Sequence, residues 1–299
     1  MTVTGLIAGV ETGGTKTVAA VAAQGEPGTI LAEVEVPTTT PDEVGARLRE
    51  FLRSHGDIAR VGVAAFGPLD LDPASPAFGT VVATPKPGWS GVDLAALIGR
   101  RPVAIVSDVT GAALGEAAAG ATAGVRDSAY ITVGTGIGVG VLLGGRPFSG
   151  TSHPELGHIS MRRHPGDAFC GACPFHGGDC VEGLAAGPAV SARWGRPSHD
   201  LGVDLDRAVE FEAFYLAQLI ATVSYAYRPQ RIVLGGGAMK IPGLLDAVRE
   251  ASVRELRGAL GAGHPSNDPE HYLVRPALGD RSGVTGALRL AATQTTDAA

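Results

Sequence analysis

All three cysteines of this 299-residue chain lie in one eleven-residue window, with a histidine among them. Two residues separate Cys173 from His176, and three more separate His176 from Cys180. Thiolate sulfur and imidazole nitrogen are ligands that zinc prefers, and such short spacers let them converge on one tetrahedral ion. A disulfide is the other arrangement open to clustered cysteines. The spacing favours zinc, with Cys173, His176 and Cys180 as three of its ligands.

The fourth zinc ligand has to come from outside this short segment. His158 and Cys170 are the two candidates, and spacing by itself does not choose between them. Four protein ligands close the coordination shell of zinc, which is the arrangement found in structural rather than catalytic sites. We therefore expect a structural zinc site within residues 158–180.

A carboxylate at the end of a predicted strand is the main candidate for acid–base chemistry. The apolar run Val103–Val106 predicts a buried strand, Asp108 follows it, and the alanine-rich segment Gly111–Ala119 predicts a helix. In open α/β sheets, ligands bind at the carboxyl ends of strands, where Asp108 would lie. Asp108 or Thr110 could instead cap the helix without taking part in any reaction. Both interpretations are open at this point.

A glycine-rich turn near the start of the chain has the groups that hold a phosphate. The turn Glu11–Lys16 joins two apolar runs, Leu6–Val10 and Thr17–Ala23, so the pattern predicts strand, turn and strand. It offers backbone N–H groups, two hydroxyls and an ammonium. The turn is not a Walker A loop, because no helix signal follows Lys16. A plain hairpin without a ligand is the alternative.

The same pattern recurs in the second half of the chain. Gly134–Gly138 joins the predicted strands Tyr130–Val133 and Val139–Leu143, which suggests an internal duplication. Its spacing does not fit the dinucleotide fingerprint. Two such hairpins facing each other would bracket a polyphosphate. A third glycine turn, Gly235–Gly237, lies between the strand Arg231–Leu234 and a helix expected near position 242, where nucleotide phosphates bind readily.

The remaining segments are predicted to form further helices and strands, and the glycine- and proline-rich segment 70–88 is predicted to be a loop. The predicted helices are 41–55, 92–98, 184–193 and 205–225, and a further buried strand is 58–66, closed by Gly67-Pro68. The chain has only three lysines, and two of them, Lys16 and Lys240, flank glycine turns, while the third is Lys86. This placement gives mild support to the phosphate-binding interpretation.

Composition excludes several other classes of protein. A net charge of −6 without basic runs argues against a nucleic-acid-binding surface. The sequence has no run of eighteen apolar residues, which is the length needed to span a bilayer. The N-terminus lacks the basic region of a signal peptide. We therefore expect a cytoplasmic protein with reduced thiols, which again favours a metal over a disulfide. Residues Thr293–Ala299 read as a disordered tail.

A resemblance to a known family rests on motifs spread over nearly the whole chain. They are GVETGGTK, AAFGPLD, SDVTGAALGE, VGTGIGVG, HPELGH, RHPGD, CPFHGGDCVEGLAAGPA, LGGG and LGDRSGVTGAL. In these motifs the chain resembles the ROK family of sugar kinases, and specifically its bacterial fructokinase-like branch. The resemblance implies an α/β, actin-like ATPase (ribonuclease-H-like) duplicated fold with ATP in an interdomain cleft. The domains would be 1–115, completed by a C-terminal helix at about 276–293, and 116–275 with the zinc site.

The resemblance also implies roles for individual residues. It makes Asp108 the general base, and it selects His158 over Cys170 as the fourth ligand beside Cys173, His176 and Cys180. The residues implied for the sugar are Gly67, Pro68, Thr110, Glu155, His158 and Glu182. The residues implied for the nucleotide are Gly13, Gly14, Thr15, Lys16, Thr135, Gly136, Pro188, Gly235, Gly236, Gly237 and Lys240. The implied cofactors are ATP, Mg²⁺ and a structural Zn²⁺, and the implied assembly is a homodimer.

The activity expected from this resemblance is transfer of the ATP γ-phosphate to the 6-hydroxyl of a hexose, and fructose is the favoured hexose. The chain departs from the family at Thr110, where an asparagine is usual, and Gly178 lengthens the cysteine segment by one residue. A hydroxyl replaces only part of the hydrogen-bonding capacity of an amide. The alternatives are a ROK kinase for glucose, mannose or an N-acetylated hexosamine, a ROK-type repressor, and a non-catalytic, zinc-braced sugar-binding protein. The acidic charge, and a first strand that begins at Leu6 and leaves no room for a helix-turn-helix, argue against the repressor.

Overall fold

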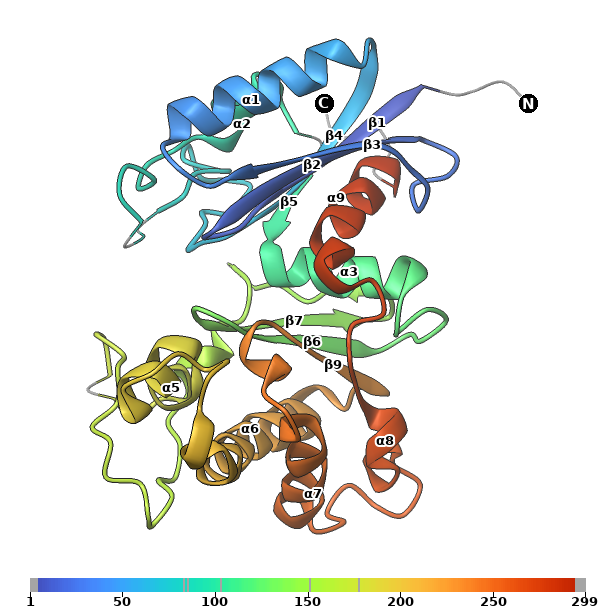
Figure 1. Ribbon diagram of the computed structural model, residues 1–299. Coiled ribbons are helices and arrows are strands. Elements are labelled where there is room, and N and C mark those ends of the chain that lie inside the picture. Colours follow the sequence, from blue (N-terminus) through green and yellow to red (C-terminus); the bar gives the residue numbers. More distant parts are fainter. Residues whose placement is uncertain are drawn as a thin grey trace. The chain divides into compact units, whose positions relative to one another are not determined.

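The computed structural model describes residues 5–293 except 83, 85, 103, 151 and 177. The disordered tail was predicted to begin at Thr293, but Thr293 is the last residue of a helix, and the rest of the predicted tail lies outside the described residues. The chain divides into two compact units (Figure 1). Unit 1 comprises the chain up to Gly124, Pro147–His153 and the chain from Ala277, and unit 2 comprises Val125–Arg146 and Pro154–Pro276.

Each unit contains a five-stranded mixed sheet, and the two sheets have the same strand arrangement. The order in unit 1 is β3-β2-β1-β4-β5, with β1 (Leu6–Thr12), β2 (Lys16–Ala23), β3 (Ile30–Pro37), β4 (Ile58–Ala65) and β5 (Ala104–Ser107). The other sheet has the order β8-β7-β6-β9-β10, with β6 (Ser128–Val133), β7 (Ile137–Leu143), β8 (Arg146–Pro147), β9 (Arg231–Gly235) and β10 (Leu273–Val274).

The strand pairings repeat as well. In each sheet an antiparallel hairpin, β1–β2 or β6–β7, lies next to a parallel strand, β4 or β9. Both predicted strand–turn–strand units are therefore present, and the matching topology supports the predicted duplication.

Helices cover both faces of the unit 1 sheet, which explains why β1 and β2 are apolar almost throughout. On one face, α1 (Pro41–Ser54) and α2 (Leu94–Ile98) pack with Ala8 and Val10, and on the other α9 (Ser282–Thr293) packs with Ile7 and Val18 (Figure 1). The helix α3 (Asp108–Ala119) lies against α9.

The core of unit 2 is formed by its sheet and by its helices. These helices are α4 (Val181–Ala185), α5 (Gly187–Trp194), α6 (Leu205–Tyr227), α7 (Leu244–Leu256) and α8 (Pro269–Tyr272). Buried side chains of α6 such as Leu216 and Leu219 belong to the same apolar cluster as Ile131 and Val133 of β6. No helix in the described part of the chain combines the length and apolarity that crossing a membrane requires.

The structure corrects four details of the sequence-based prediction. The helix expected at 184–193 is two helices, α4 and α5, which meet at Ala186 because Pro188 lies in the first turn of α5, where a proline starts a helix. The helix expected from position 92 begins at Leu94, capped by Asp93. The strand expected to be buried is mostly half-buried, because β5 is an edge strand. The edge strand β3 was missed, although its alternation of more and less exposed residues is a strand signal.

The division between the units keeps α3 whole. The predicted boundary at 115–116 falls inside α3, which stays in unit 1 as a whole, and residues 147–153 belong to unit 1 rather than to unit 2. The buried carboxylate of Glu116 accepts hydrogen bonds from the N–H groups of Ala121, Ala277 and Leu278 and from the Ser282 hydroxyl. This carboxylate ties the end of α3 to the returning chain before α9.

Helices α3 and α9 approach each other through glycines. A Cβ added at Gly286 would overlap the carbonyl oxygen of Gly111, and one added at Gly115 would overlap that of Ser282. The two backbones are thus in direct contact, and neither can move without disturbing the sheet beneath α9.

We expect Gly286→Ala to lower the free energy of unfolding by about 3 kcal/mol, because the new methyl group has to push two helix backbones apart. Gly25→Ala is the control, since nothing lies within 4 Å of a Cβ at that position. Urea unfolding followed by circular dichroism measures both. Equal stability of the two variants would contradict the close packing of α3 and α9.

Candidate active site

Three parallel strands of unit 1 end side by side, and each is followed by a predicted site residue. Thr12 of β1 is paired in register with Ala65 of β4, which is paired with Ser107 of β5. The chain continues from these ends into the glycine turn from Gly13, into Gly67-Pro68 and into Asp108. The sheet therefore brings the predicted phosphate turn, two predicted sugar-binding residues and the predicted base to one edge.

Asp108 is the first residue of α3 and does not cap it. The cap is Ser107, whose Oγ accepts the N–H of Thr110 at 3.3 Å, so neither residue named as a possible cap has that role. Asp108 is half-buried, and its Oδ1 accepts the N–H of Val109 at 2.7 Å. Thr110 is 4% exposed, and its hydroxyl accepts a hydrogen bond from Ser107 Oγ at 2.8 Å. The sugar-binding role of Thr110 stays a prediction.

Glu11 is a second carboxylate near Asp108. Burial, and secondarily the charge of Asp108, raise the pKa of Glu11 to about 7, although the N–H of Val284 and the ammonium of Lys16 act in the opposite direction. Among the described residues its Oε2 has no hydrogen-bond partner. From the sequence, Glu11 has no predicted role beyond membership of the turn. The raised pKa shows that this edge disfavours a second negative charge.

This pKa predicts a pH dependence of stability. Because the pKa of Glu11 in the folded protein, about 7, lies above its ordinary value of 4.5, the protonated form favours folding. The stabilisation of the fold by protonated Glu11 is complete below pH 4.5 and is lost as the pH rises through about 7. We expect Glu11→Gln to unfold like the wild type near pH 4.5 but to be more stable by about 3 kcal/mol at pH 8. Urea unfolding between these pH values tests this, with Glu26→Gln as control. Parallel wild-type and Glu11→Gln profiles would contradict it.

The first glycine turn has a defined geometry and is contacted by Lys86, a cation with no role predicted from the sequence. Gly13 N–H donates to Lys16 O at 2.8 Å, while Gly14 and Thr15 are exposed. Lys16 is paired with Glu35 at 2.8 Å. Lys86 Nζ donates to the carbonyl oxygen of Gly14 at 2.8 Å, so all three lysines lie at or beside glycine turns.

Unit 2 repeats this arrangement with its own glycine turns. Thr132 of β6 is paired in register with Gly235 of β9, so the turn Gly134–Gly136 and the turn Gly235–Gly237 leave the same sheet edge. Gly236 has a φ of +93°, and a Cβ there would overlap the backbone of Val133. Only glycine allows this approach.

Helix α5 begins at the same edge. The N–H of Gly187 donates to the carbonyl oxygen of Gly134 at 2.8 Å, which places Pro188 next to the turn that contains Thr135 and Gly136. Lys240 is exposed at the end of a 3-10 turn, Ala238–Lys240, that follows Gly237. The predicted nucleotide residues of unit 2 are therefore assembled at one edge.

Glu155 precedes a single 3-10 turn, Leu156–His158, and His158 is the last residue of that turn. A side chain at Gly157 would overlap the Ile137 carbonyl oxygen, which explains the glycine between them. Glu182 Oε2 accepts the N–H of Ile137 at 2.9 Å, and its Oε1 is 3.9 Å from His158 Nε2. Glu182 thus links the second glycine turn to His158.

The four predicted metal ligands come together. Their ligand atoms all lie within 4.8 Å of one another. Cys173 Sγ is 3.8 Å from His158 Nδ1 and 3.5 Å from His176 Nδ1, and Cys180 Sγ is 3.9 Å from His158 Nδ1. A tetrahedral zinc with ordinary bond lengths has sulfur–nitrogen edges of about 3.5 Å, so this donor set fits zinc.

The geometry separates His158 from Cys170 as the fourth member of the cluster. Cys170 is exposed and lies outside the group, whereas Cys173 and Cys180 are buried. Burial raises the pKa of Cys180 to about 11, so binding of a cation would displace a proton from this thiol. Gly178, the extra residue of the segment, has a φ of +98° and packs on Gly171.

A buried ion network anchors the loop that carries these ligands. Arg193 of α5 donates to Asp167 at 3.0 Å and approaches Glu212 of α6 at 3.4 Å, and all three side chains are at most 5% exposed. Burial acts to raise the pKa of Asp167, but hydrogen bonds from Tyr215, Phe169 and Arg193 lower it overall. Burial raises the pKa of Glu212 well above its usual value. This segment was known from the sequence only as the family motif RHPGD, and no ion network was predicted there.

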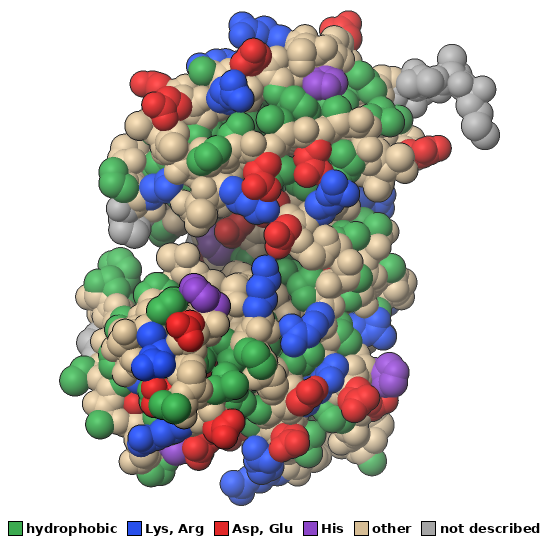
Figure 2. Space-filling model, in the orientation of Figure 1, with side chains coloured by type: hydrophobic (Ala, Val, Ile, Leu, Met, Phe, Trp, Pro, Cys, Tyr) green, Lys and Arg blue, Asp and Glu red, His purple; other side chains and the backbone are tan. Residues whose placement is uncertain are grey.

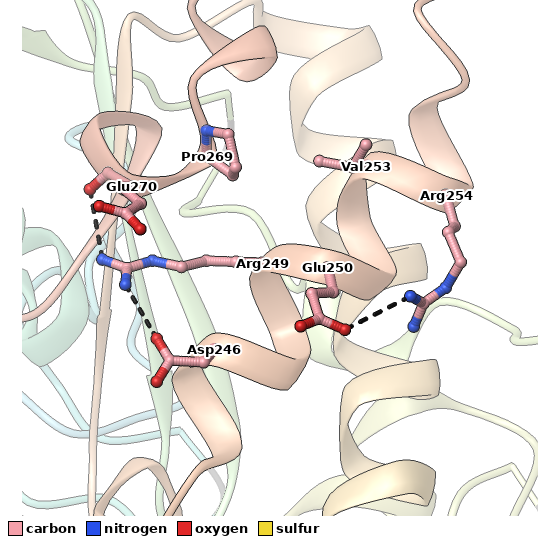
Figure 3. Close-up of a pocket in the computed structure, with 7 residues that line it drawn as sticks. All are labelled: Asp246, Arg249, Glu250, Val253, Arg254, Pro269 and Glu270. Atoms are coloured by element: carbon pink, nitrogen blue, oxygen red, sulfur yellow. Dashed lines mark hydrogen bonds and ion pairs between the residues drawn. The ribbon is translucent and has the colours of Figure 1, made fainter.

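A pocket elsewhere in unit 2 has a different lining from the predicted site. A pocket of about 510 Å³ lies at α7 and α8, and its lining contains two ion pairs, Arg249 with Asp246 at 3.0 Å and Arg254 with Glu250 at 3.6 Å (Figure 3). None of the predicted site residues lines it. The face shown in Figure 2 has acidic and basic side chains intermixed.

Comparison with known proteins identifies the family. The model of the ROK family matches residues 7–294. The chain belongs to the ROK family. It is 43% identical to a fructokinase of Zymomonas mobilis over 88% of this chain and 89% of that protein. It is 39% identical to a fructokinase of Streptococcus mutans over 96% of this chain and 97% of that protein.

A solved structure of a relative agrees with the fold. A ROK family glucokinase from Streptomyces griseus, solved with glucose and AMPPNP, superposes with a TM-score of 0.73 and 26% identity, covering 97% of this chain and all of that one. This ROK protein therefore has the predicted α/β, actin-like ATPase fold with two sheets of equal topology.

Proposed function

We propose that this ROK protein is an ATP-dependent fructokinase that converts fructose to fructose 6-phosphate. The observation that carries the proposal is its similarity, at 43% and 39% identity over most of the chain, to proteins named fructokinase. The sheet edge that carries both Asp108 and a glycine turn agrees with this reaction, because phosphoryl transfer needs a base and a phosphate-binding turn in one site.

Asp108 acts as the general base. The oxygen of the fructose 6-hydroxyl forms a bond to the γ-phosphorus of ATP while the bond from that phosphorus to the β–γ bridging oxygen breaks. ADP leaves, and the hydroxyl proton moves to the Asp108 carboxylate. The half-burial of Asp108 and its place at the end of β5, with the capping task left to Ser107, support this role.

The glycine turns bind the nucleotide. Backbone N–H groups of Gly14 and Thr15 and of Thr135 and Gly136 hold phosphate oxygens, in turns that Gly13 and Gly134 close with their own N–H groups. Gly235–Gly237 with Pro188 and Lys240 hold the rest of ATP. Bound Mg²⁺ supplies neutralising charge for the phosphates. The protein positions the reactants, which is the larger part of catalysis in such transfers.

The cysteine–histidine cluster holds a structural zinc. His158, Cys173, His176 and Cys180 supply the ligands, and the ion, when bound, closes the loop at residues 158–180. Glu182 Oε1 lies 3.9 Å from His158 Nε2, and Glu182 Oε2 accepts the N–H of Ile137 in the second glycine turn. A bound zinc would thereby fix the loop that carries His158, close to Glu155 and Glu182, and these three residues are proposed for the sugar. Gly67, Pro68 and Thr110 are the further residues proposed for it.

We further propose that the enzyme works in the cytoplasm as a homodimer. Reduced thiols are required to keep Cys173 and Cys180 available for zinc, and the cytoplasm keeps thiols reduced. Size-exclusion chromatography with light scattering tests the dimer.

The decisive experiment measures ADP release with Mg-ATP and a panel of fructose, mannose, glucose and N-acetylmannosamine. We expect kcat/KM for fructose to exceed that for the other sugars. A preference for glucose or mannose would contradict the fructokinase assignment and support a ROK hexokinase of other specificity. Sugar binding without turnover of any sugar would leave the non-catalytic sugar-binding protein.

A further inference from the structure

An ammonium from a distant loop lies at the first glycine turn. Lys86 Nζ donates a hydrogen bond to the carbonyl oxygen of Gly14 at 2.8 Å, although the two residues are 72 positions apart in the chain. Lys86, in the glycine- and proline-rich segment, thus contacts the turn between β1 and β2 within unit 1.

The backbone around Lys86 is anchored. The N–H of Lys86 donates to Thr84 Oγ1 at 3.3 Å, and its carbonyl oxygen accepts the N–H of Trp89 at 3.2 Å. Trp89 is completely buried, and its indole N–H donates to the carbonyl oxygen of Thr39 at 2.8 Å. A buried tryptophan three residues away holds the start of the Lys86 side chain in place.

The two lysines at this turn differ in how their charge is neutralised. Lys16 Nζ is 2.8 Å from a carboxylate oxygen of Glu35 and 3.7 Å from one of Asp280. Among the described residues, the contact of the Lys86 ammonium is with a neutral carbonyl oxygen. An ammonium has three N–H donors, so Lys86 keeps two donors and its charge for an anion.

We propose that Lys86 is a catalytic residue that binds the phosphoryl group in transfer, a role that rests on the proposed kinase function. In the transition state, negative charge spreads over the oxygens of the transferred group, and a fixed cation stabilises it. The bond to Gly14 orients the ammonium and leaves its other two N–H groups for phosphate oxygens. Lys16, whose charge Glu35 offsets, organises the turn and contributes less to the transfer.

The test compares Lys86→Met, Lys86→Arg and Lys16→Met with the wild type. Methionine has the length of lysine without its charge. We expect Lys86→Met to lower kcat for fructose about 10²–10³-fold with the KM for fructose within about twofold. We expect Lys86→Arg to recover part of the loss and Lys16→Met to cost less than Lys86→Met. Arg47→Met is the control, since Arg47 is an exposed cation on α1 and lies outside the site.

Near-ultraviolet circular dichroism, which reports on buried Trp89, verifies that each variant is folded. If the wild type phosphorylates fructose, a kcat of Lys86→Met within threefold of the wild type overturns the role of Lys86 and leaves the kinase assignment intact. If the wild type phosphorylates no sugar, the proposed function fails, and calorimetric titration with Mg-ATP then decides about Lys86. At least tenfold weaker Mg-ATP binding by Lys86→Met than by Arg47→Met supports a phosphate contact, and equal affinities overturn it.

Discussion

Asp108→Asn is expected to lower kcat for fructose phosphorylation by about 10²–10⁴-fold, because the amide cannot accept the proton of the attacking hydroxyl. The fold should be unaffected, since Ser107 rather than Asp108 caps α3. Affinity for fructose should change little, because asparagine keeps the size and part of the hydrogen-bonding capacity of aspartate. The expected result is therefore a loss in kcat with a nearly constant KM.

Asp42→Asn is a matched control for this variant. Asp42 lies in the first turn of α1, as Asp108 lies in the first turn of α3, and both changes remove a negative charge near a helix N-terminus. Steady-state ADP release at saturating ATP measures the two variants. If Asp108→Asn keeps more than about a tenth of wild-type kcat, the assignment of the base is wrong. A similar loss in Asp42→Asn would point to a helix-dipole effect instead.

Cys173→Ala is expected to release the zinc and to reduce kcat/KM for fructose at least about tenfold, with Cys180→Ala giving the same result. Both thiols are buried in the four-residue cluster, and loss of one ligand leaves an open, weaker site. Without the ion, the loop at residues 158–180 loses the bond that holds His158, and with it the order around Glu182. Metal analysis should show about one zinc per chain in the wild type and almost none in these variants.

Cys170→Ser provides the matched control, because Cys170 lies in the same loop but is exposed and outside the cluster. It should keep the zinc and the activity of the wild type. The buried network of Arg193, Asp167 and Glu212 does not depend on the metal and should keep the outer part of the loop attached. Full zinc content in Cys173→Ala, or loss of zinc in Cys170→Ser, would contradict the proposed ligand set. Zinc loss without any change in fructose kinetics would contradict the positioning role.

Short-range patterns in the sequence predicted most of the local structure of this protein. Both strand–glycine turn–strand units and the long helix from Leu205 follow from alternating, continuous or helical runs of apolar residues. The Cys173–His176–Cys180 spacing identified three members of the cluster, because ligands this close in sequence can meet with little help from the rest of the fold. Family motifs then supplied the fold, which the strand order of the two sheets matches.

Tertiary structure decided the questions that depend on residues far apart in the sequence. His158 rather than Cys170 completes the cluster because the turn at Leu156–His158 packs on β7, through Gly157. The ends of β1, β4 and β5 meet because of parallel register, and local sequence does not encode register. Lys86 reaches Gly14 only because buried Trp89 fixes a loop whose own sequence has no regular period. Local backbone preferences determine where elements begin and end, whereas long-range packing determines which side chains meet.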